Sequence, residues 1–480
     1  MNYRAVALPI GRLLIIIAAF MVIPAGADLI ARNPDWIVFT ISALILGTVG
    51  TLTTAAFSSA APDLRRRETF VFVNAAWITF CTAGAIPLYG SGLGISFTDA
   101  FFESASGLTT TGSTILTGLD QLPPGILLWR SLLQWIGGIG IVVIGIWLLP
   151  GLRVGGSQLF ALESSETANK PYGRIEPFLK RLITLYGGLT IACTSLYILC
   201  GMSVFQAINH ALTTVSTGGF STSDSSFGQF GGTAVYWVSI IFMLASSVPF
   251  LFLIRRIEGK RADDRQQIHV LLAAVGLASF AIFLSQRWVQ HDDPFHLFTV
   301  SVFHVVSVIT TTGYASTDYL TWGSLVICIF FLLTFFGGCS GSTSGGFKMF
   351  RLALLLSYIR VLLRRMIHPH RVLSPRYDGR PVGNAVMEGV FVFAILYAGT
   401  FALFGLAYAG LGMDVLTAFS GSITALANVG PGVGDIIGPS GTFQSLPDAA
   451  KWLLSLEMIL GRLEIIAGLV ILMPDFWEEA

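Results

Sequence analysis

Long apolar segments separated by short polar ones make up most of this chain. Several approach or reach the roughly 20 residues that an α-helix needs to cross a bilayer, among them 70–88, 127–149, 182–200 and 386–411. Shorter apolar segments stand between pairs of long ones, at 97–109, 204–215, 294–309 and 414–427. A helix of about 13 residues is roughly 20 Å long and cannot cross a ~30 Å core. The short segments are therefore predicted to enter the membrane and return on the same side.

The order of these segments predicts one unit four times: an outer helix, a pore helix, a return segment and a second helix. We expect an all-α polytopic membrane protein, with four tandem helix–pore loop–helix repeats around a central pore and two extra transmembrane helices before them. The expected divisions are a two-helix extension at 1–60 and repeats at 61–150, 151–258, 259–380 and 381–480. This arrangement has ten membrane-crossing segments and four re-entrant ones. The first segment ends on Ala25-Gly26-Ala27, as a signal peptide can, but we expect a transmembrane helix.

Each return segment is rich in Thr or Val and ends on a glycine. The candidate ion-binding residues are Thr110-Thr111-Gly112, Val215-Ser216-Thr217-Gly218, Thr311-Thr312-Gly313 and Asn428-Val429-Gly430. A cation that loses its water shell needs replacement oxygens, and a ring of backbone carbonyls supplies them. Glycine adopts the unusual backbone angles that turn carbonyls toward one axis. One such segment alone would be an ordinary turn, but four of them, each after a pore-helix-length segment, predict a cation selectivity filter.

The charge pattern orients the chain in the membrane. Only 11% of the residues are charged, against about 25% in soluble proteins. Of the 28 lysines and arginines, 23 lie in the N-terminus and in segments 60–69, 151–181, 255–266 and 348–381. The positive-inside rule places those segments and the N-terminus in the cytoplasm. Segments 151–181 and 348–381 would contact either a partner protein or lipid headgroups. No feature points to a nucleic-acid partner.

An aspartate follows each filter glycine on the opposite side of the membrane: Asp120, Asp224, Asp318 and Asp435. Each one alone would be an ordinary solvated loop residue. Because all four occupy the same place in their repeats, we expect them to line an acidic outer mouth. Such a mouth would raise the local cation concentration.

The second helix of the third repeat is interrupted by a run of small residues. Ten consecutive Gly, Ser, Thr and Cys residues cannot form a stable lipid-facing helix. The run contains Gly338, Cys339, Ser340, Gly341, Ser342, Thr343, Ser344, Gly345 and Gly346. Lys348 follows it, either at its cytoplasmic end or as a lysine that snorkels to the headgroups.

Arg462 stands inside the last long apolar segment. An intramembrane charge is costly and faces the protein interior, a water-filled path or a partner. A structural ion pair with Glu464 or Glu457 would account for such a charge.

These features resemble the Trk/Ktr/HKT superfamily of potassium transporters, and in particular its TrkH-type family, over essentially the whole chain. Thr311-Thr312-Gly313-Tyr314 is similar to the T-V-G-Y-G potassium filter. The resemblance implies that Gly112, Gly218, Gly313 and Gly430 are the filter glycines, and that glycine rather than serine at 112 favours potassium. It also implies that 338–346 is a gating loop, and that Arg462 lines the ion path near this loop and restrains cation flow. The sequence departs from T-V-G-Y-G at Ala315, and repeat four lacks Thr.

The resemblance further implies potassium uptake across the bacterial inner membrane, with K+ as the transported substrate and no catalytic site. It implies a homodimer and a cytoplasmic regulatory ring of the TrkA type that binds nucleotides. The alternative is an alternating-access symporter that couples K+ to H+ or Na+, since broken helices occur there too. Such carriers often contain inverted repeats, whereas the four repeats here share one orientation.

Overall fold

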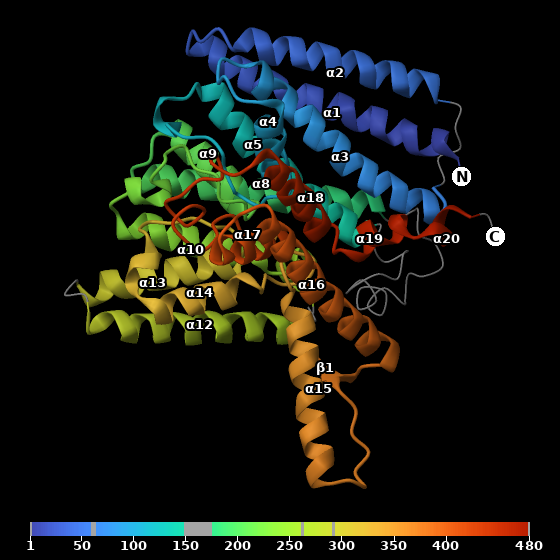
Figure 1. The fold of residues 1–480 in the computed structure, drawn as a ribbon, viewed down its shortest axis with the longest axis vertical. Helices are drawn as coiled ribbons and strands as arrows, with labels where there is room; N and C mark the ends of the chain where they lie inside the picture. The colour runs from blue at the N-terminus through green and yellow to red at the C-terminus, as the bar shows by residue number, and fades with distance from the viewer. Residues whose placement is uncertain (1, 59–63, 148–174, 261–263, 290–292, 479–480) are drawn as a thin grey trace.

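The computed structural model describes residues 2–58, 64–147, 175–260, 264–289 and 293–478. Most of the predicted basic segment 151–181 lies outside the described residues. Helices dominate the fold (Figure 1). Seven of the described helices are long and apolar enough to cross a membrane, or eight if one bent pair counts as a single span.

Two helices precede the repeats, as predicted. Helices α1 (Tyr3–Ile30) and α2 (Trp36–Ala56) pack against each other, and α1 also packs on α3 (Arg66–Gly90) and α5 (Pro124–Trp147). Gly11 and Gly50 allow the close approach, because a Cβ on Gly50 would lie 2.8 Å from the Gly11 carbonyl oxygen. The three helices α1, α2 and α3 lie side by side along one edge of the molecule in Figure 1.

The four repeats follow in chain order. Repeat 1 contains α3, α4 (Phe97–Leu108) and α5. Repeat 2 contains α8 (Ile175–Leu199), α9 (Val204–Val215), α10 (Thr233–Ser247) and α11 (Phe250–Ile257). Repeat 3 contains α12 (Arg265–Arg287), α13 (Pro294–Ile309), α14 (Ser324–Thr334) and α15 (Met349–Ile367). Repeat 4 contains α16 (Asn384–Gly410), α17 (Val415–Ala427), α18 (Asp448–Arg462) and α19 (Ile466–Leu469). The remaining short elements are η1 (Leu119–Gln121), η2 (Ser226–Gln229), η3 (Tyr319–Trp322), η4 (Val470–Leu472) and α20 (Pro474–Trp477).

The repeats close into a ring. The second helix of each repeat packs against the pore helix of the next: α5 on α9, α10 on α13, α14 on α17, and α18 back on α4. This cyclic order brings the C-terminal ends of all four pore helices, α4, α9, α13 and α17, to the middle of the molecule. The partly negative end of each helix dipole is then directed toward the same region, which favours a cation there.

The pore helices begin where the sequence supplies an N-cap. Ser96, Ser203, Asp293 and Asp414 each accept a hydrogen bond from a backbone N–H in the first turn of the helix that follows. A side-chain cap satisfies one of the four free N–H groups of a helix start and stabilises it by about 1 kcal/mol. The four predicted short segments therefore coincide with the observed helices to within a residue or two.

The second helices of repeats 2 and 4, which follow the pore helices, contain breaks that the ten predicted crossings did not include. Helices α10 and α11 meet at 98°, because Pro249 cannot continue the helix and lacks an N–H donor. Helix α18 ends at Arg462, and Glu464 and Ile465 both take positive φ angles. The second helices of repeats 2 and 4, each expected as one membrane-crossing segment, are therefore divided by a break.

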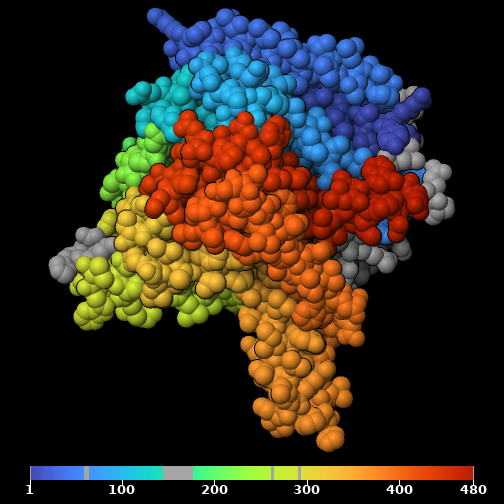
Figure 2. Space-filling model, viewed as in Figure 1, coloured from blue at the N-terminus to red at the C-terminus, as the bar shows by residue number. Residues whose placement is uncertain are grey.

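A narrow arm extends from the body of the molecule. It consists of α15 and a two-stranded antiparallel hairpin, β1 (Arg376–Tyr377) and β2 (Arg380–Pro381), as Figures 1 and 2 show. Asp378 and Gly379 form the turn with φ angles of 46° and 81°, which suits the Asp-Gly pair that short hairpins favour. This hairpin is a small addition to the expected all-α fold.

Candidate ion-conduction site

The four return segments share one backbone conformation. Each begins with a residue in the left-handed region just after the pore helix: Thr110 (φ 55°), Thr217 (51°), Thr311 (58°) and Asn428 (57°). Two residues later each has a glycine with positive φ: Gly112 (89°), Gly219 (81°), Gly313 (82°) and Gly430 (108°). The repetition of this pattern in four unrelated stretches of sequence means that one backbone shape is built four times.

The repeat-2 glycine of this pattern is Gly219, and the assignment of Gly218 is corrected. The amide of Gly218 donates to the Thr213 carbonyl at 2.9 Å, just as the amide of Thr111 donates to Ser106 at 2.9 Å. Gly218 is thus equivalent to Thr111. The clue in the sequence is the aromatic residue after the glycine, since Phe220 follows Gly219 as Tyr314 follows Gly313.

The same shift moves two other predicted residues away from the ring. Val215 is the last residue of α9 and is buried in the apolar core. Ser216 is the C-cap of that helix, and its hydroxyl donates to the Thr213 carbonyl at 3.2 Å. The part of repeat 2 that takes part in the shared backbone is Thr217-Gly218-Gly219.

The four segments contact one another in a closed cycle. A Cβ on Gly112 would lie 2.3 Å from the Gly218 oxygen, and one on Gly219 would lie 1.8 Å from the Thr312 oxygen. A Cβ on Gly313 would lie 2.1 Å from the Val429 oxygen, and one on Gly430 would lie 2.7 Å from the Thr111 oxygen. Each glycine therefore faces the carbonyl of the next segment, and only glycine fits there. We call these four segments the filter ring.

Repeat 4 joins the filter ring without a threonine. Asn428 takes the left-handed position, which asparagine tolerates better than most residues. Its Nδ2 donates to Thr111 Oγ1 at 3.0 Å and to the Met458 carbonyl at 3.0 Å, so the side chain links segments 4 and 1 to α18.

The glycine-rich interruption of repeat 3 lies directly against the filter ring. The Thr217 hydroxyl donates to Thr343 Oγ1 at 3.1 Å, and the amide of Gly345 donates to Thr311 Oγ1 at 2.8 Å. The Ser344 hydroxyl donates to the Thr310 carbonyl at 2.8 Å. The loop thus contacts the ends of two pore helices at the residues where the left-handed turn begins.

The opposite side of this loop is held by the broken helix of repeat 2. The amide of Cys339 donates to the Ser247 carbonyl at 2.8 Å, and the amide of Phe250 donates to the Gly341 carbonyl at 2.9 Å. The amide of Ser340 donates to Gln267 Oε1 at 2.9 Å, and the Ser342 hydroxyl donates to Cys339 within the loop at 2.6 Å. The break at Pro249 exposes the backbone groups that make these bonds. Gly338 and Gly346 flank the loop, and Gly346 has a φ of 68°.

Two buried cations lie beside the loop. Arg462 Nη1 donates to the Thr343 carbonyl at 2.9 Å, and Lys348 Nζ donates to the Ser344 carbonyl. Both side chains line a small cavity together with loop residues. Two further nitrogens of Arg462 have no hydrogen-bond partner among the described residues. Arg462 thus brings a positive charge to the loop directly beneath the filter ring.

Arg462 is not paired with either glutamate that the sequence offered. Glu464 forms an ion pair with Arg351, whose guanidinium also lies 3.6 Å above the Phe393 ring. Glu457 accepts from the Tyr408 and Ser422 hydroxyls, at 2.7 Å each. Of the two readings of Arg462, the position beside the loop is the one that the described contacts support.

The four aspartates of the expected outer mouth fall into two groups. Asp224 accepts from the amides of Gly118 and Leu119, at 2.9 and 3.1 Å, and its own amide donates to Asp120 at 3.4 Å. Asp120 and Asp224 are therefore brought together. Asp318 caps η3 through the Leu320 amide at 3.0 Å, and Asp435 is exposed. In the described part of the chain, no hydrogen bond joins these last two to the others.

A model of the family described as "TrkH: Cation transport protein" matches residues 37–277 and 270–478. The chain belongs to the TrkH family. This TrkH-family chain is 42% identical to the Trk system potassium uptake protein TrkI of Halomonas elongata, over 97% of the chain and 95% of that protein. It is 34% identical to the Trk system potassium uptake protein TrkH of Escherichia coli over the full length of both.

A solved structure agrees with the fold of this TrkH-family chain. The crystal structure of the potassium transporter TrkH from Vibrio parahaemolyticus superposes with a TM-score of 0.91. The two chains are 33% identical, and each is covered completely. The expected fold class and family are thereby confirmed.

Sequence reasoning missed three polar residues behind the filter ring: Glu103, Arg130 and Gln134. The signal was present in part, since a glutamate in a pore helix and an arginine in a membrane-crossing segment are both intramembrane charges.

Proposed function

We propose that this chain conducts potassium across the bacterial inner membrane through a channel-like pore, with the filter ring as its selectivity filter. The observation that supports this most strongly is the closed cycle in which each glycine faces the carbonyl oxygen of the next segment. A ring of main-chain oxygens from four segments is what a dehydrated cation requires. The potassium uptake systems to which the relatives belong supply the choice of ion.

In this proposal, K+ approaches from the side of Asp120 and Asp224 and loses its water at the filter ring. Carbonyls of Thr110-Thr111-Gly112, Thr217-Gly218-Gly219, Thr311-Thr312-Gly313 and Asn428-Val429-Gly430 replace that water. The dipoles of the four pore helices lower the cost of holding a positive charge there. Neutral oxygens bind weakly enough for the ion to leave.

The loop at 338–346 is the gate in this proposal. It contacts Thr217 and Thr311 directly, so an ion that leaves the filter ring meets it next. Arg462 donates to the same loop and adds a positive charge in the path. Opening requires the loop to give up its bonds to the filter ring and to move away from Arg462.

From the family resemblance we also propose a homodimer and a nucleotide-binding regulatory ring of the TrkA type, and from the distribution of lysines and arginines a cytoplasmic N-terminus. Measurement of the molecular mass of the purified protein in detergent tests the homodimer. Co-purification of the chain with a TrkA-type regulatory subunit encoded in the same genome tests the regulatory ring.

The test of the proposed function is growth of a potassium-uptake-deficient bacterium on low potassium, with wild type and Gly112→Ser compared. Wild type is expected to restore growth. Gly112→Ser is expected to lower the potassium-over-sodium preference, because its Cβ would lie 2.3 Å from the Gly218 oxygen. Gly118→Ser is the matched control, since Gly118 also has positive φ but has no atom within 4 Å of the added Cβ. Unchanged preference in Gly112→Ser would contradict the filter assignment.

Electrical recording separates a channel from an alternating-access symporter. A channel-like pore gives unitary current steps across a bilayer that contains the purified protein. A symporter gives flux without such steps, together with movement of H+ or Na+ in fixed proportion to K+.

A further inference from the structure

Three pore helices carry a polar side chain at the same place, seven residues before the left-handed residue of the filter ring. These side chains are Glu103, His210 and His304, and repeat 4 has Gly421 there. All three polar side chains are completely buried. A buried polar group is retained only where it has hydrogen-bond partners, so their partners indicate what the position does.

Each of the three side chains contacts the segment that follows the filter ring in its own repeat. Glu103 Oε2 accepts from the Ile115 amide at 2.9 Å, and His304 Nε2 accepts from the Ser316 amide at 3.1 Å. His210 Nε2 lies 3.1 Å from Ser221 Oγ. The Nδ1 atom of each histidine lies within 3.0 Å of a backbone carbonyl, which can only accept, so Nδ1 carries the proton. His304 is neutral, because its Nε2 accepts from an amide and therefore carries no proton.

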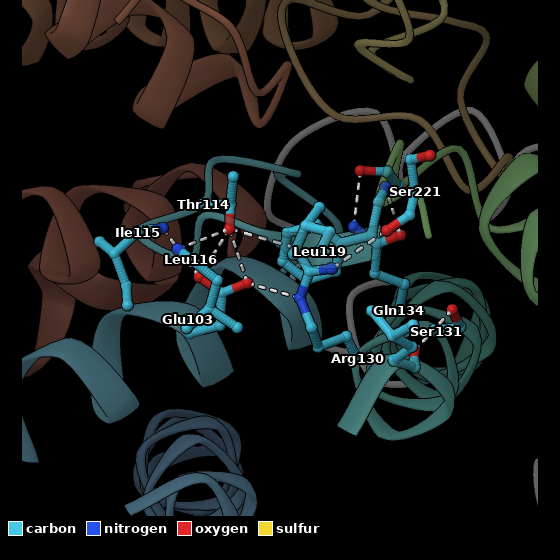
Figure 3. Close-up of polar contacts among 12 residues, drawn as sticks. Glu103, Thr114, Ile115, Leu116, Leu119, Arg130, Ser131, Gln134 and Ser221 are labelled. Atoms are coloured by element: carbon cyan, nitrogen blue, oxygen red, sulfur yellow. Dashed lines mark hydrogen bonds and ion pairs between the residues drawn. The ribbon is translucent and has the colours of Figure 1, made fainter. Parts of the chain in front are cut away.

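Repeat 1 differs because its side chain is charged and paired. Arg130 Nε donates to Glu103 Oε1 at 2.7 Å, and the two side chains are 1% and 0% exposed (Figure 3). Arg130 also donates to Thr114 Oγ1 in its own repeat and to the Ser221 carbonyl in repeat 2, at 3.1 Å each. Its guanidinium lies 4.1 Å from the centroid of the Phe220 ring. One ion pair thus contacts the segments that follow the filter ring in both repeat 1 and repeat 2.

Gln134, one helical turn after Arg130 on α5, contacts the filter ring itself. Its Nε2 donates to the Gly218 carbonyl at 2.6 Å, and its Oε1 accepts from the Phe220 amide at 3.1 Å. The Gly218 oxygen is the one that faces Gly112 in the cycle of contacts. Gln134 therefore contacts one of the four carbonyls directly, through a hydrogen bond from another helix.

We propose that Glu103, Arg130 and Gln134 form a positioning cluster that sets cation selectivity by orienting the repeat-2 segment of the filter ring against the repeat-1 segment. The proposal rests on the proposed function. A buried charge-assisted pair is short and directional, and loss of either member leaves an unpaired charge in a low dielectric. The pair therefore resists the small carbonyl rotations that would let the ring adapt to a smaller ion.

The test is the potassium-to-sodium permeability ratio of purified protein in liposomes. Gln134→Glu keeps the shape and the acceptor for Phe220 but replaces the donor to Gly218 with an oxygen. We expect the ratio to fall about tenfold, the effect of losing one strong buried hydrogen bond. Glu103→Gln removes the charge that Arg130 pairs with and should lower the ratio in the same direction.

Ser131→Ala is the matched control. Ser131 lies on the same helix, and its hydroxyl donates to Asn209 Oδ1 at 2.8 Å, away from the filter ring. This variant should leave the ratio unchanged. Because the ratio does not depend on how much protein folds, a purely structural role would change total flux but not the ratio.

The outcomes separate the two proposals. If Gly112→Ser lowers the ratio while Gln134→Glu and Glu103→Gln leave it unchanged, the positioning cluster is refuted and the proposed function stands. If all three leave it unchanged, both are refuted. A fall in Gln134→Glu and Glu103→Gln without a fall in Ser131→Ala supports the positioning cluster.

Discussion

The filter ring and the loop beneath it are in direct contact, yet they are built in opposite ways. The filter ring takes one segment from each repeat, with the same backbone angles in all four. The loop comes from repeat 3 alone and contacts the ends of α9 and α13 through side-chain and backbone hydrogen bonds. In the proposed function, ion coordination therefore uses an element present in all four repeats, whereas gating depends on an element present in repeat 3 alone.

The two regions also differ in what resists change. In the filter ring, glycine faces a backbone carbonyl at a distance that no other side chain can accept. In the loop, each contact is a hydrogen bond with a net contribution of about 0.5–1.5 kcal/mol. We therefore expect substitutions in the filter ring to impair potassium transport or its selectivity, and substitutions in the loop to change the basal flux.

The largest effect is expected from Gly219→Ala. The new Cβ would lie 1.8 Å from the Thr312 carbonyl oxygen, and φ is already 81°, so the ring must deform at a cost of more than about 4 kcal/mol. Potassium uptake per folded protein molecule should fall by well over tenfold, because about 1.4 kcal/mol corresponds to a factor of ten. Gly276→Ala on α12, where nothing lies within 4 Å, is the control and should transport normally. Normal uptake by Gly219→Ala would refute the corrected register of repeat 2.

A smaller effect in the opposite direction is expected from Thr343→Val. The change keeps the shape of the side chain but removes the hydroxyl that contacts Thr217 and the Ser246 carbonyl. Basal potassium flux should rise by about tenfold, since roughly 1.4 kcal/mol of loop stabilisation is lost. Thr334→Val removes only a hydroxyl bond within α14 and should not change flux. Reduced flux in well-folded Thr343→Val protein would mean that the loop is not a gate.

Removal of the Arg462 charge beside the loop should have a moderate effect on basal cation flux. Arg462→Met is expected to raise basal cation flux several-fold, on the order of 1 kcal/mol of barrier, because a positive charge next to the path is gone. Arg351→Met is the contrasting variant. It breaks the ion pair with Glu464 and should lower the free energy of unfolding by about 3 kcal/mol without opening the pore. Equal increases in flux from both variants would contradict a specific role for Arg462.

The smallest effect is expected from Ser203→Ala, which removes the capping box of α9. The free energy of unfolding should fall by about 1 kcal/mol, seen as a lower melting temperature in detergent. The permeability ratio should not change, because the filter ring is untouched. Ser195→Ala, an exposed helical position, serves as the control for stability. A changed ratio in Ser203→Ala would show that the pore-helix starts, and not only their ends, determine selectivity.

The parts of the fold that local chemistry determines could be predicted from the sequence. The pore helix expected at 204–215 is Val204–Val215, because Ser203 caps its start and its length forbids a crossing. The break at Pro249 had a visible cause in the sequence, whereas the hydrogen bonds between the freed backbone groups and the loop of repeat 3 did not. The expected Gly218 is one residue too early, since the sequence distinguishes it from Gly219 only through the aromatic residue that follows, and the backbone angles settle the register.

The positioning cluster could not be predicted for a different reason. Gln134 and Gly218 are 84 residues apart, and they meet only because α5 packs against the pore helix of the next repeat. The same packing brings Arg130 to Ser221 across 91 residues. Contacts of this kind follow from the cyclic order of the repeats, which no local pattern contains.

The most direct test is anomalous scattering from crystals of the purified protein soaked in Rb+ or Tl+, which replace K+. We expect a peak on the axis between Thr111, Gly218, Thr312 and Val429, at similar distances from all four carbonyl oxygens. Peaks found only outside this ring, with none between the four segments, would contradict the central claim that the four repeats together build one cation site.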